Sequence, residues 1–286
     1  KQLIVSLRHA ESLPGSLPEE AEDVHLWLLV PPTSEGTKRL RTILPSSSVR
    51  IGGASGANFT ELNRERPDTV SEVWDHIGFA GSPQVHAFDD ASILETPPTI
   101  ATALQSARAF TDAPLCVGPL TFYGSYQRDD PRQKTVLAAV WYFAALTYAI
   151  YGDATHVTLC ETVGPRGIIG TEGETYPIYH LLHGFAEAAQ GAVCEVEVSD
   201  TLSVAALAFD TLTGGQRVLV ANLTQSESTV AIKGMKRTDI AGLRVLSEES
   251  EGLFGETQTV AQDADGAFVV TLPGRSIGWL HLETPK

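Results

Sequence analysis

Cationic residues are scarce in this sequence of 286 residues, which contains 20 Lys and Arg against 35 Asp and Glu. The resulting formal net charge of −15 repels nucleic-acid phosphates and anionic lipid surfaces, so we expect neither nucleic acid nor membrane as a partner. Long apolar runs are missing too. The longest lies at residues 136–150, and it is shorter than the ~20 residues that a membrane-spanning helix needs, so it predicts a buried helix.

Cysteine is rare, and its spacing excludes further classes of protein. Cys116, Cys160 and Cys194 are an odd number at wide spacing without a CxxC pair, which argues against a disulfide framework and against a zinc site. We therefore expect a cytoplasmic location and no metal. His180 and His183 lie three positions apart, but without a supporting carboxylate or cysteine they are interpreted as surface or packing residues. The GxGxxG and GxSxG motifs are also lacking, and we expect no cofactor.

The first two thirds of the chain alternate short β-branched runs with helical patterns, which is typical of βα units around a parallel sheet. Six strands are predicted, at residues 3–7, 25–30, 49–53, 76–80, 115–122 and 156–161. Helices are predicted at about 35–44, 69–74, 100–111, 135–151 and 177–190. A complete (β/α) barrel has eight strands, so the first units are missing, shortened or not recognisable in the pattern.

From residue 191 onward only strands are predicted, several of them with the period-two alternation of half-buried antiparallel sheets. They lie at residues 193–198, 204–209, 217–222, 229–232, 243–247, 257–261, 267–272 and 277–282. We therefore predict an α/β fold with two domains. A TIM-barrel-like (β/α) domain, in which six of eight barrel strands are recognisable, occupies residues 1–190, and an all-β sandwich occupies residues 191–286.

Polar residues follow the third predicted strand, where the carboxyl ends of parallel strands converge and chemistry takes place in barrels. Asn58, Glu61, Asn63 and Arg64 crowd polar groups into seven positions after a glycine-rich turn. These residues are interpreted as candidates for catalysis and substrate binding. The alternative is a solvated loop with a surface salt bridge.

The later strand ends carry further candidates. His86 after the fourth strand would act as a general base if Asp89 oriented its ring, whereas Asp90 is equally consistent with capping the next helix. Glu161 closes the last barrel strand, where an unpaired carboxylate is costly to bury; the alternative is an ion pair with Arg166.

Several strings of the sequence are specific: NFTELNR at 58–64, PQVHAFDDAS at 83–92, SARAF at 106–110 and ANLT at 221–224. Together with Glu161-Thr162, they resemble the D-apionate lactonase family. That resemblance implies a bacterial enzyme of carbohydrate catabolism, with a glycoside-hydrolase-like TIM barrel and an appended β-sandwich. It also implies a hydrolase that opens a sugar-acid lactone with water.

Lactone opening needs an activated water, a donor for the oxyanion and a proton for the leaving alkoxide. We expect Glu161 or Glu61 to be the general base and His86 with Asp89 to be the acid or orienting pair. The substrate would be held by Asn58, Asn63 and Arg64, with Tyr123 after the fifth strand as a platform for a sugar ring. The expected partner is a small carbohydrate or sugar-acid lactone.

Two alternatives stay open. Glu61 and Glu161 would suit hydrolysis of a glycosidic bond if their carboxyl groups lie at a suitable distance. A chain that lacks barrel strands is also consistent with a non-catalytic carbohydrate-binding protein. The sequence does not indicate the oligomeric state, and a partner subunit that completes the barrel remains an open alternative.

Overall fold

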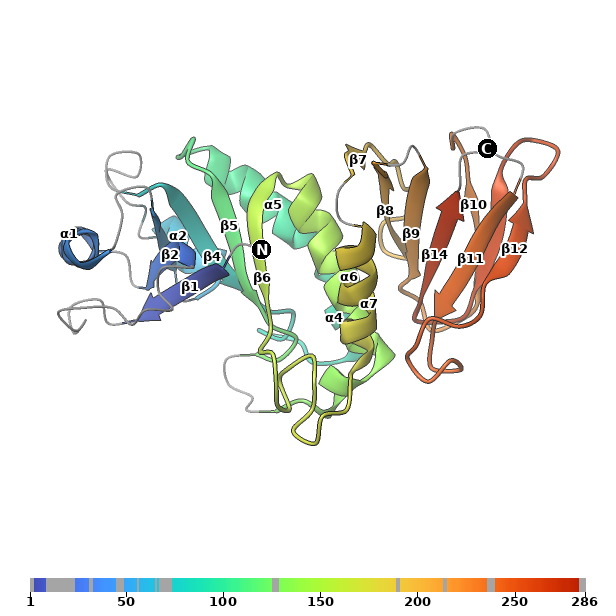
Figure 1. Cartoon of the computed structure of the whole chain (residues 1–286), viewed down its shortest axis with the longest axis horizontal. Coiled ribbons are helices and arrows are strands. Elements are labelled where there is room, and N and C mark those ends of the chain that lie inside the picture. The colour runs from blue at the N-terminus through green and yellow to red at the C-terminus, as the bar shows by residue number, and fades with distance from the viewer. Residues whose placement is uncertain are drawn as a thin grey trace. The chain divides into compact units, whose positions relative to one another are not determined.

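The structure is a computed structural model, and Figure 1 shows the whole chain. It describes residues 3–8, 24–30, 33–44, 49–55, 57–64, 66, 74–124, 129–188, 191–212, 215–235 and 240–282. The chain divides into two compact units. The first comprises Lys1–Ser82, Thr99–Thr121 and Tyr148–Leu159, and the second comprises Pro83–Pro98, Phe122–Thr147 and Cys160–Lys286.

The first unit is built on a six-stranded sheet in which every neighbouring pair of strands is parallel. The strands lie side by side in chain order: β1 (Leu3–Arg8), β2 (Val24–Val30), β3 (Arg50–Ser55), β4 (His76–Gly81), β5 (Leu115–Leu120) and β6 (Ala154–Leu159). The six predicted parallel strands are thus confirmed. In the described part of the chain the sheet is open, with β1 and β6 at its edges.

Helices lie in the described connections from β2 to β6, as is usual between parallel strands. They are α1 (Ser34–Ile43), α2 (Phe59–Arg64), α4 (Asp90–Glu95), α5 (Pro98–Arg108) and α6 (Val136–Tyr151). Thr33 begins α1 by accepting a hydrogen bond from Gly36 N at 3.0 Å, which satisfies a free amide of the first turn. In α5, the apolar side chains of Ile100, Leu104 and Ala107 are buried at the predicted helical period.

Two short helices, α2 and α4, form where the sequence pattern indicated only loops. Six residues are too few to establish a helical period, so the pattern could not reveal them. The helix predicted at about 69–74 lies almost wholly outside the described residues.

The long apolar run was interpreted correctly, because α6 is buried on all sides from Val136 to Ala145. Among the described residues, no helix combines the length and apolar character that crossing a bilayer requires.

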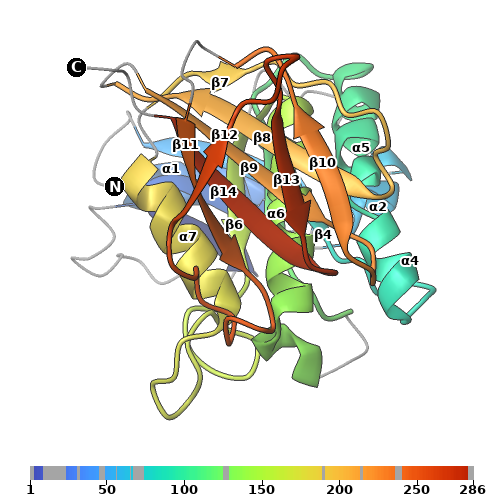
Figure 2. The ribbon, with the colours of Figure 1, turned by 90° about the vertical axis from the view of Figure 1, so that its right-hand side faces the viewer.

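The second unit contains an antiparallel β-sandwich (Figure 2). One sheet has the order β12-β11-β14-β9-β8-β7, and a second pairs β10 with β13. The strands are β7 (Val193–Cys194), β8 (Val204–Asp210), β9 (Gln216–Asn222), β10 (Ser228–Ile232), β11 (Ile240–Leu246), β12 (Gln258–Ala261), β13 (Phe268–Leu272) and β14 (Ser276–Leu282). All eight predicted strands are present, although β7 is much shorter than residues 193–198. The predicted domain boundary at residue 190 stays a prediction.

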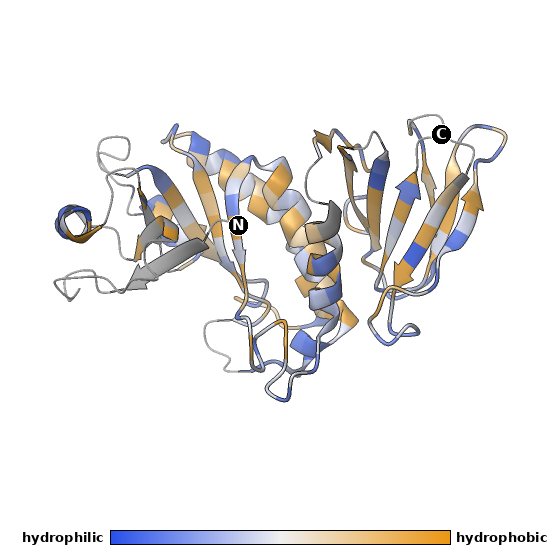
Figure 3. Cartoon of the chain, viewed as in Figure 1, coloured by the Kyte–Doolittle hydropathy of each residue, from blue (hydrophilic) through white to orange (hydrophobic). Residues whose placement is uncertain are grey.

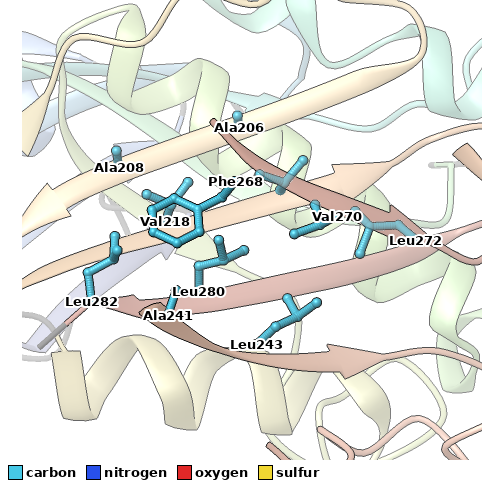
Figure 4. Close-up of a cluster of buried hydrophobic side chains, with 11 residues drawn as sticks. Ala206, Ala208, Val218, Ala241, Leu243, Phe268, Val270, Leu272, Leu280 and Leu282 are labelled. Atoms are coloured by element: carbon cyan, nitrogen blue, oxygen red, sulfur yellow. The ribbon is translucent and has the colours of Figure 1, made fainter. Parts of the chain in front are cut away.

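The core of the sandwich follows from alternation along β13. Phe268, Val270 and Leu272 are buried, whereas Val269 and Thr271 between them are exposed. The buried set packs against Val218 and Leu280 of the other sheet, among further side chains (Figure 4). The same alternation of apolar and polar residues is visible along the sandwich strands in Figure 3. Sheet-on-sheet packing of apolar faces accounts for the fold of this sandwich.

Candidate active site

Three loops of the second unit, which follow β4, β5 and β6, are joined by buried hydrogen bonds. Gln84 Nε2, after β4, donates to Phe122 O at 2.7 Å and to Asp130 Oδ2 at 2.8 Å, both after β5. Gln133 Nε2 donates in turn to Gly167 O, after β6, at 2.9 Å. The backbones also approach closely, because a Cβ added to Gly124 would clash with Gln84 O. Buried polar side chains therefore hold these three loops together, and we refer to this hydrogen-bonded set as the polar layer.

Arg132 is the centre of this layer. Its guanidinium donates to Asp90 Oδ1 at 2.7 Å, to Asp130 Oδ2 at 2.8 Å and to Gln84 Oε1 at 3.1 Å. Arg275, in the turn between β13 and β14, holds the other oxygen of Asp90 at 2.9 Å. Burial by itself would raise the pKa of Asp130, but hydrogen bonds from Arg132 and Gln84 outweigh it and lower that pKa. This network was not predicted, because in the sequence only the Asp130-Pro131 pair, typical of a helix start, marks the segment.

A second buried group supports the loops from within the second unit. Phe122 N donates to the hydroxyl of Tyr142 at 2.9 Å, and that hydroxyl donates to Gln133 Oε1 at 3.3 Å. Burial raises the pKa of Tyr142 well above its ordinary value, and it also raises the pKa of the Cys160 thiol. Both groups are therefore protonated at neutral pH, and Cys160 is not activated as a nucleophile.

The solvent-accessible part of the layer brings together Glu161, Arg166 and Tyr123. Arg166 Nε lies 3.6 Å from Glu161 Oε1 and 3.7 Å from Asp129 Oδ1, and its guanidinium carbon lies 5.0 Å from the centre of the Tyr123 ring. Burial and the negative charge of Glu161 raise the pKa of Tyr123, so its phenol keeps its proton. A carboxylate, a guanidinium and a neutral phenol thus lie close together at the solvent-accessible surface. The ion pair between Glu161 and Arg166, which was the alternative interpretation of Glu161, is present.

The residues predicted after β4 have different surroundings. Asp89 is the N-cap of α4: its carboxylate accepts hydrogen bonds from Ser92 N at 2.9 Å and Ser92 Oγ at 2.7 Å, which lower its pKa. The prediction that Asp90 caps this helix is wrong, because Asp90 lies inside the helix and pairs with Arg132. His86 is exposed, and within the described residues no hydrogen bond joins it to Asp89.

The candidates after β3 belong to the first unit. Arg64 Nη1 lies 3.1 Å from Glu61 Oε1 along α2, with 70% and 45% of the two side chains exposed, which is the surface salt bridge foreseen as the alternative. Asn63 Oδ1 accepts a hydrogen bond from Arg66 at 2.6 Å. The backbone carbonyl of Asn58 accepts from Glu61 N at 3.1 Å. Their direct interactions are therefore with one another and with neighbours along the chain.

A separate cavity of about 280 Å³ lies in the second unit, next to α7 (Pro177–Ala188). Its lining residues are His180, His183, Gly184, Arg244, Leu253, Phe254, Trp279 and His281. His180 Nε2 lies 3.1 Å from Thr175 Oγ1, and both His180 and His183 contact the ring of Tyr179. The two histidines are thus packed at the edge of a cavity, as residues of the helix surface.

Comparison with known proteins identifies the family. A family model described as D-apionate lactonase, TIM barrel domain, matches residues 24–190. The chain belongs to the D-apionate lactonase family. The D-apionate lactonase of Brucella anthropi is 32% identical over 167 residues, which cover 52% of this chain and 27% of that protein. The chain therefore corresponds to little more than a quarter of this curated relative.

Solved structures agree with this member of the D-apionate lactonase family in fold. The bifunctional glucanase-xylanase CelM2 from a metagenome library matches 92% of the chain and 65% of its own, with a TM-score of 0.67 and 11% identity. The GH51 arabinofuranosidase from Xanthomonas axonopodis pv. citri matches 91% of the chain and 66% of its own, with a TM-score of 0.65 and 14% identity. The predicted family and the TIM-barrel fold with an all-β region are confirmed. The chain spans about two thirds of each of these structures.

Proposed function

We propose that this chain is a carbohydrate hydrolase that opens the lactone of a sugar acid with water. The observation that carries the proposal is the cluster of Glu161 and Arg166 after β6 with Tyr123 after β5, in a chain of the D-apionate lactonase family. The cluster offers a proton acceptor, a permanent positive charge and a proton donor to one small polar ligand. These are the three groups that lactone hydrolysis needs.

In this mechanism Glu161 takes a proton from a water molecule, whose oxygen bonds to the lactone carbonyl carbon. The charge that develops on the carbonyl oxygen is stabilised by Arg166, which stays protonated throughout. The bond between that carbon and the ring oxygen then breaks, and Tyr123 donates its proton to the leaving alkoxide. Proton transfer from Glu161 back to the Tyr123 phenolate restores the site. The carboxylic acid formed then releases its proton to solvent, and the resulting product carboxylate faces Arg166.

The buried layer beneath would position these groups. Arg132 and Gln133 tie the loops after β4, β5 and β6 together, so the cluster is held by side chains that are themselves hydrogen-bonded. His86, Asp89 and Glu61 remain proposed catalytic groups, and Asn58, Asn63 and Arg64 remain proposed substrate contacts. Of these, Asp89 has both carboxylate oxygens engaged by Ser92, which makes it the weakest candidate.

The test measures acid release in a pH-stat with a panel of aldonolactones, including D-apionolactone, and with aryl glycosides. Glu161→Gln should lower kcat by about 10²- to 10⁴-fold, which is the usual contribution of a general base. Glu172→Gln is the matched control, because Glu172 lies in the same loop and is exposed. Tyr123→Phe keeps the ring beside Arg166 but loses the proton, so kcat should fall while KM changes little.

Each other outcome contradicts part of the proposal. Full activity of Glu161→Gln would show that another group is the base. Hydrolysis of aryl glycosides without lactone opening would favour the glycosidase alternative. A folded chain that is stabilised by sugars but turns over no substrate would be a binding protein.

A further inference from the structure

Two histidines and a cysteine lie close together on one face of the sheet of the first unit. His76 opens β4, Cys116 is the second residue of β5, and His156 is the third residue of β6. The register pairs Gly78 with Cys116 and Cys116 with His156. Because paired residues of parallel strands, and residues two apart on one strand, point to the same face, all three side chains share a face.

The distances bring their donor atoms together. One ligand atom from each residue lies within 4.8 Å of the other two, and Cys116 Sγ lies 3.9 Å from His156 Nδ1. The two imidazole rings meet edge to face, with centres 5.0 Å apart. A tetrahedral Zn²⁺ site places S and N donors roughly 3.4–3.6 Å apart, given bonds of about 2.3 Å to sulfur and 2.0–2.1 Å to nitrogen. Small side-chain rotations would bring the three groups to that spacing.

The surroundings favour a site over ordinary packing. His76 is completely buried and Cys116 is 3% exposed, whereas the neighbouring buried residues Leu26 and Ala54 of this face are apolar. Gly78 allows β4 to approach β5 closely at Cys116, since an added Cβ would lie 3.1 Å from Cys116 O and 3.2 Å from Cys116 Cβ.

We propose that His76, Cys116 and His156 bind one thiolate- and imidazole-preferring divalent cation of the Zn²⁺ class, with water in the fourth position. Binding forms one bond to sulfur and two to imidazole nitrogens, and it releases the thiol proton to solvent. The ligands occupy the first three positions of their strands, at the amino ends, whereas the proposed catalytic loops follow the carboxyl ends. The cation would therefore join β4, β5 and β6 structurally, independently of lactone opening.

The test titrates the metal-free full chain with Co²⁺ and then with Zn²⁺. We expect one equivalent of Co²⁺ to produce a thiolate-to-cobalt charge-transfer band, one equivalent of Zn²⁺ to abolish it, and Zn²⁺ to raise Tm. Cys116→Ser should lose the band, and Cys194→Ser, the matched thiol control in β7, should keep it. His156→Gln, at a half-buried position, should bind at least about 100-fold more weakly, since even residues outside the ligand set typically contribute 10–100-fold.

Two results would overturn the proposal. The first is the absence of a charge-transfer band in the unmutated chain, which does not depend on any variant folding. The second is the same band and affinity in folded His156→Gln or Cys116→Ser as in the unmutated chain. Circular dichroism of each variant establishes that it is folded before its titration is interpreted.

Discussion

Replacing Arg132 with Met tests whether the buried layer under the candidate site depends on charge pairing. The carboxylate of Asp130 has only 4% of its side chain exposed, and Arg132 lies 2.8 Å from it. Removing one partner of a buried pair costs about 3–5 kcal/mol, because the remaining charge is left uncompensated. Gln84 still donates to Asp130, and Arg275 still holds Asp90. We therefore expect the lower end of that range, about 3 kcal/mol, at pH 7.

The pH dependence of this loss has a definite sign. In the unmutated chain the pKa of Asp130 is lowered, so its contribution to stability is present above the unfolded pKa of about 3.9 and is lost as pH falls through the folded pKa. In Arg132→Met, the burial that raises this pKa is opposed by Gln84 but no longer by the guanidinium. The destabilisation should then be largest at neutral pH and shrink as acid protonates Asp130, because protonation removes the buried charge.

Urea denaturation, followed by circular dichroism at pH 7 and at acidic pH, measures both effects. Arg166→Met is the control in the same unit: its ion pairs of 3.6 and 3.7 Å are partly exposed, so it should cost about 1 kcal/mol or less. Adding Asp130→Asn to Arg132→Met should recover part of the loss, which isolates the pair. The reasoning fails if Arg132→Met costs no more than Arg166→Met, or if its deficit grows as pH falls.

Two further predictions concern buried groups of the second unit. Tyr142→Phe removes the acceptor of the buried Phe122 N–H, and it should cost about 1–3 kcal/mol in the same denaturation assay, with an unchanged midpoint as the contrary result. Burial, together with the positive charges of Arg217 and Arg244, lowers the pKa of His281 to about 4. Because the unfolded histidine binds its proton near pH 6.5, the free energy of unfolding should be unaffected by His281 above that pH and should decrease from there toward pH 4. A titration midpoint of His281 near 6.5 in the folded protein, measured by NMR, would contradict this.

Much of the fold follows from local patterns. Alternating β-branched and helical runs predicted six parallel strands, and period-two alternation predicted eight strands of the sandwich. Both patterns arise because side chains repeat every 2 residues in a strand and every 3.6 in a helix, whatever the rest of the chain does. The apolar run of α6 was equally clear. The family was identifiable from strings such as PQVHAFDDAS, which need no structure to compare.

Local patterns were weaker where two neighbouring residues compete for one role. Asp89 and Asp90 are both suitable helix caps, but only Asp89 has the extended backbone (φ −77°, ψ 155°) that lets a cap accept from Ser92 N. Asp90, one position later, is then directed to Arg132 and Arg275. The choice between the two aspartates depends on where the helix begins, which the composition of the segment does not specify.

The sequence by itself therefore determined the strands and the longer helices, the family and the residue types available for chemistry. Only the tertiary structure decided which of these residues meet. Cys116 lies 40 positions from His156 and 40 from His76, and Arg132 lies 42 positions from Asp90, so no spacing motif relates them. For the two histidines and the cysteine, strand order and register bring the ligand atoms within 4.8 Å, and both are set by packing across the whole sheet, which the periodicity of any one segment does not encode.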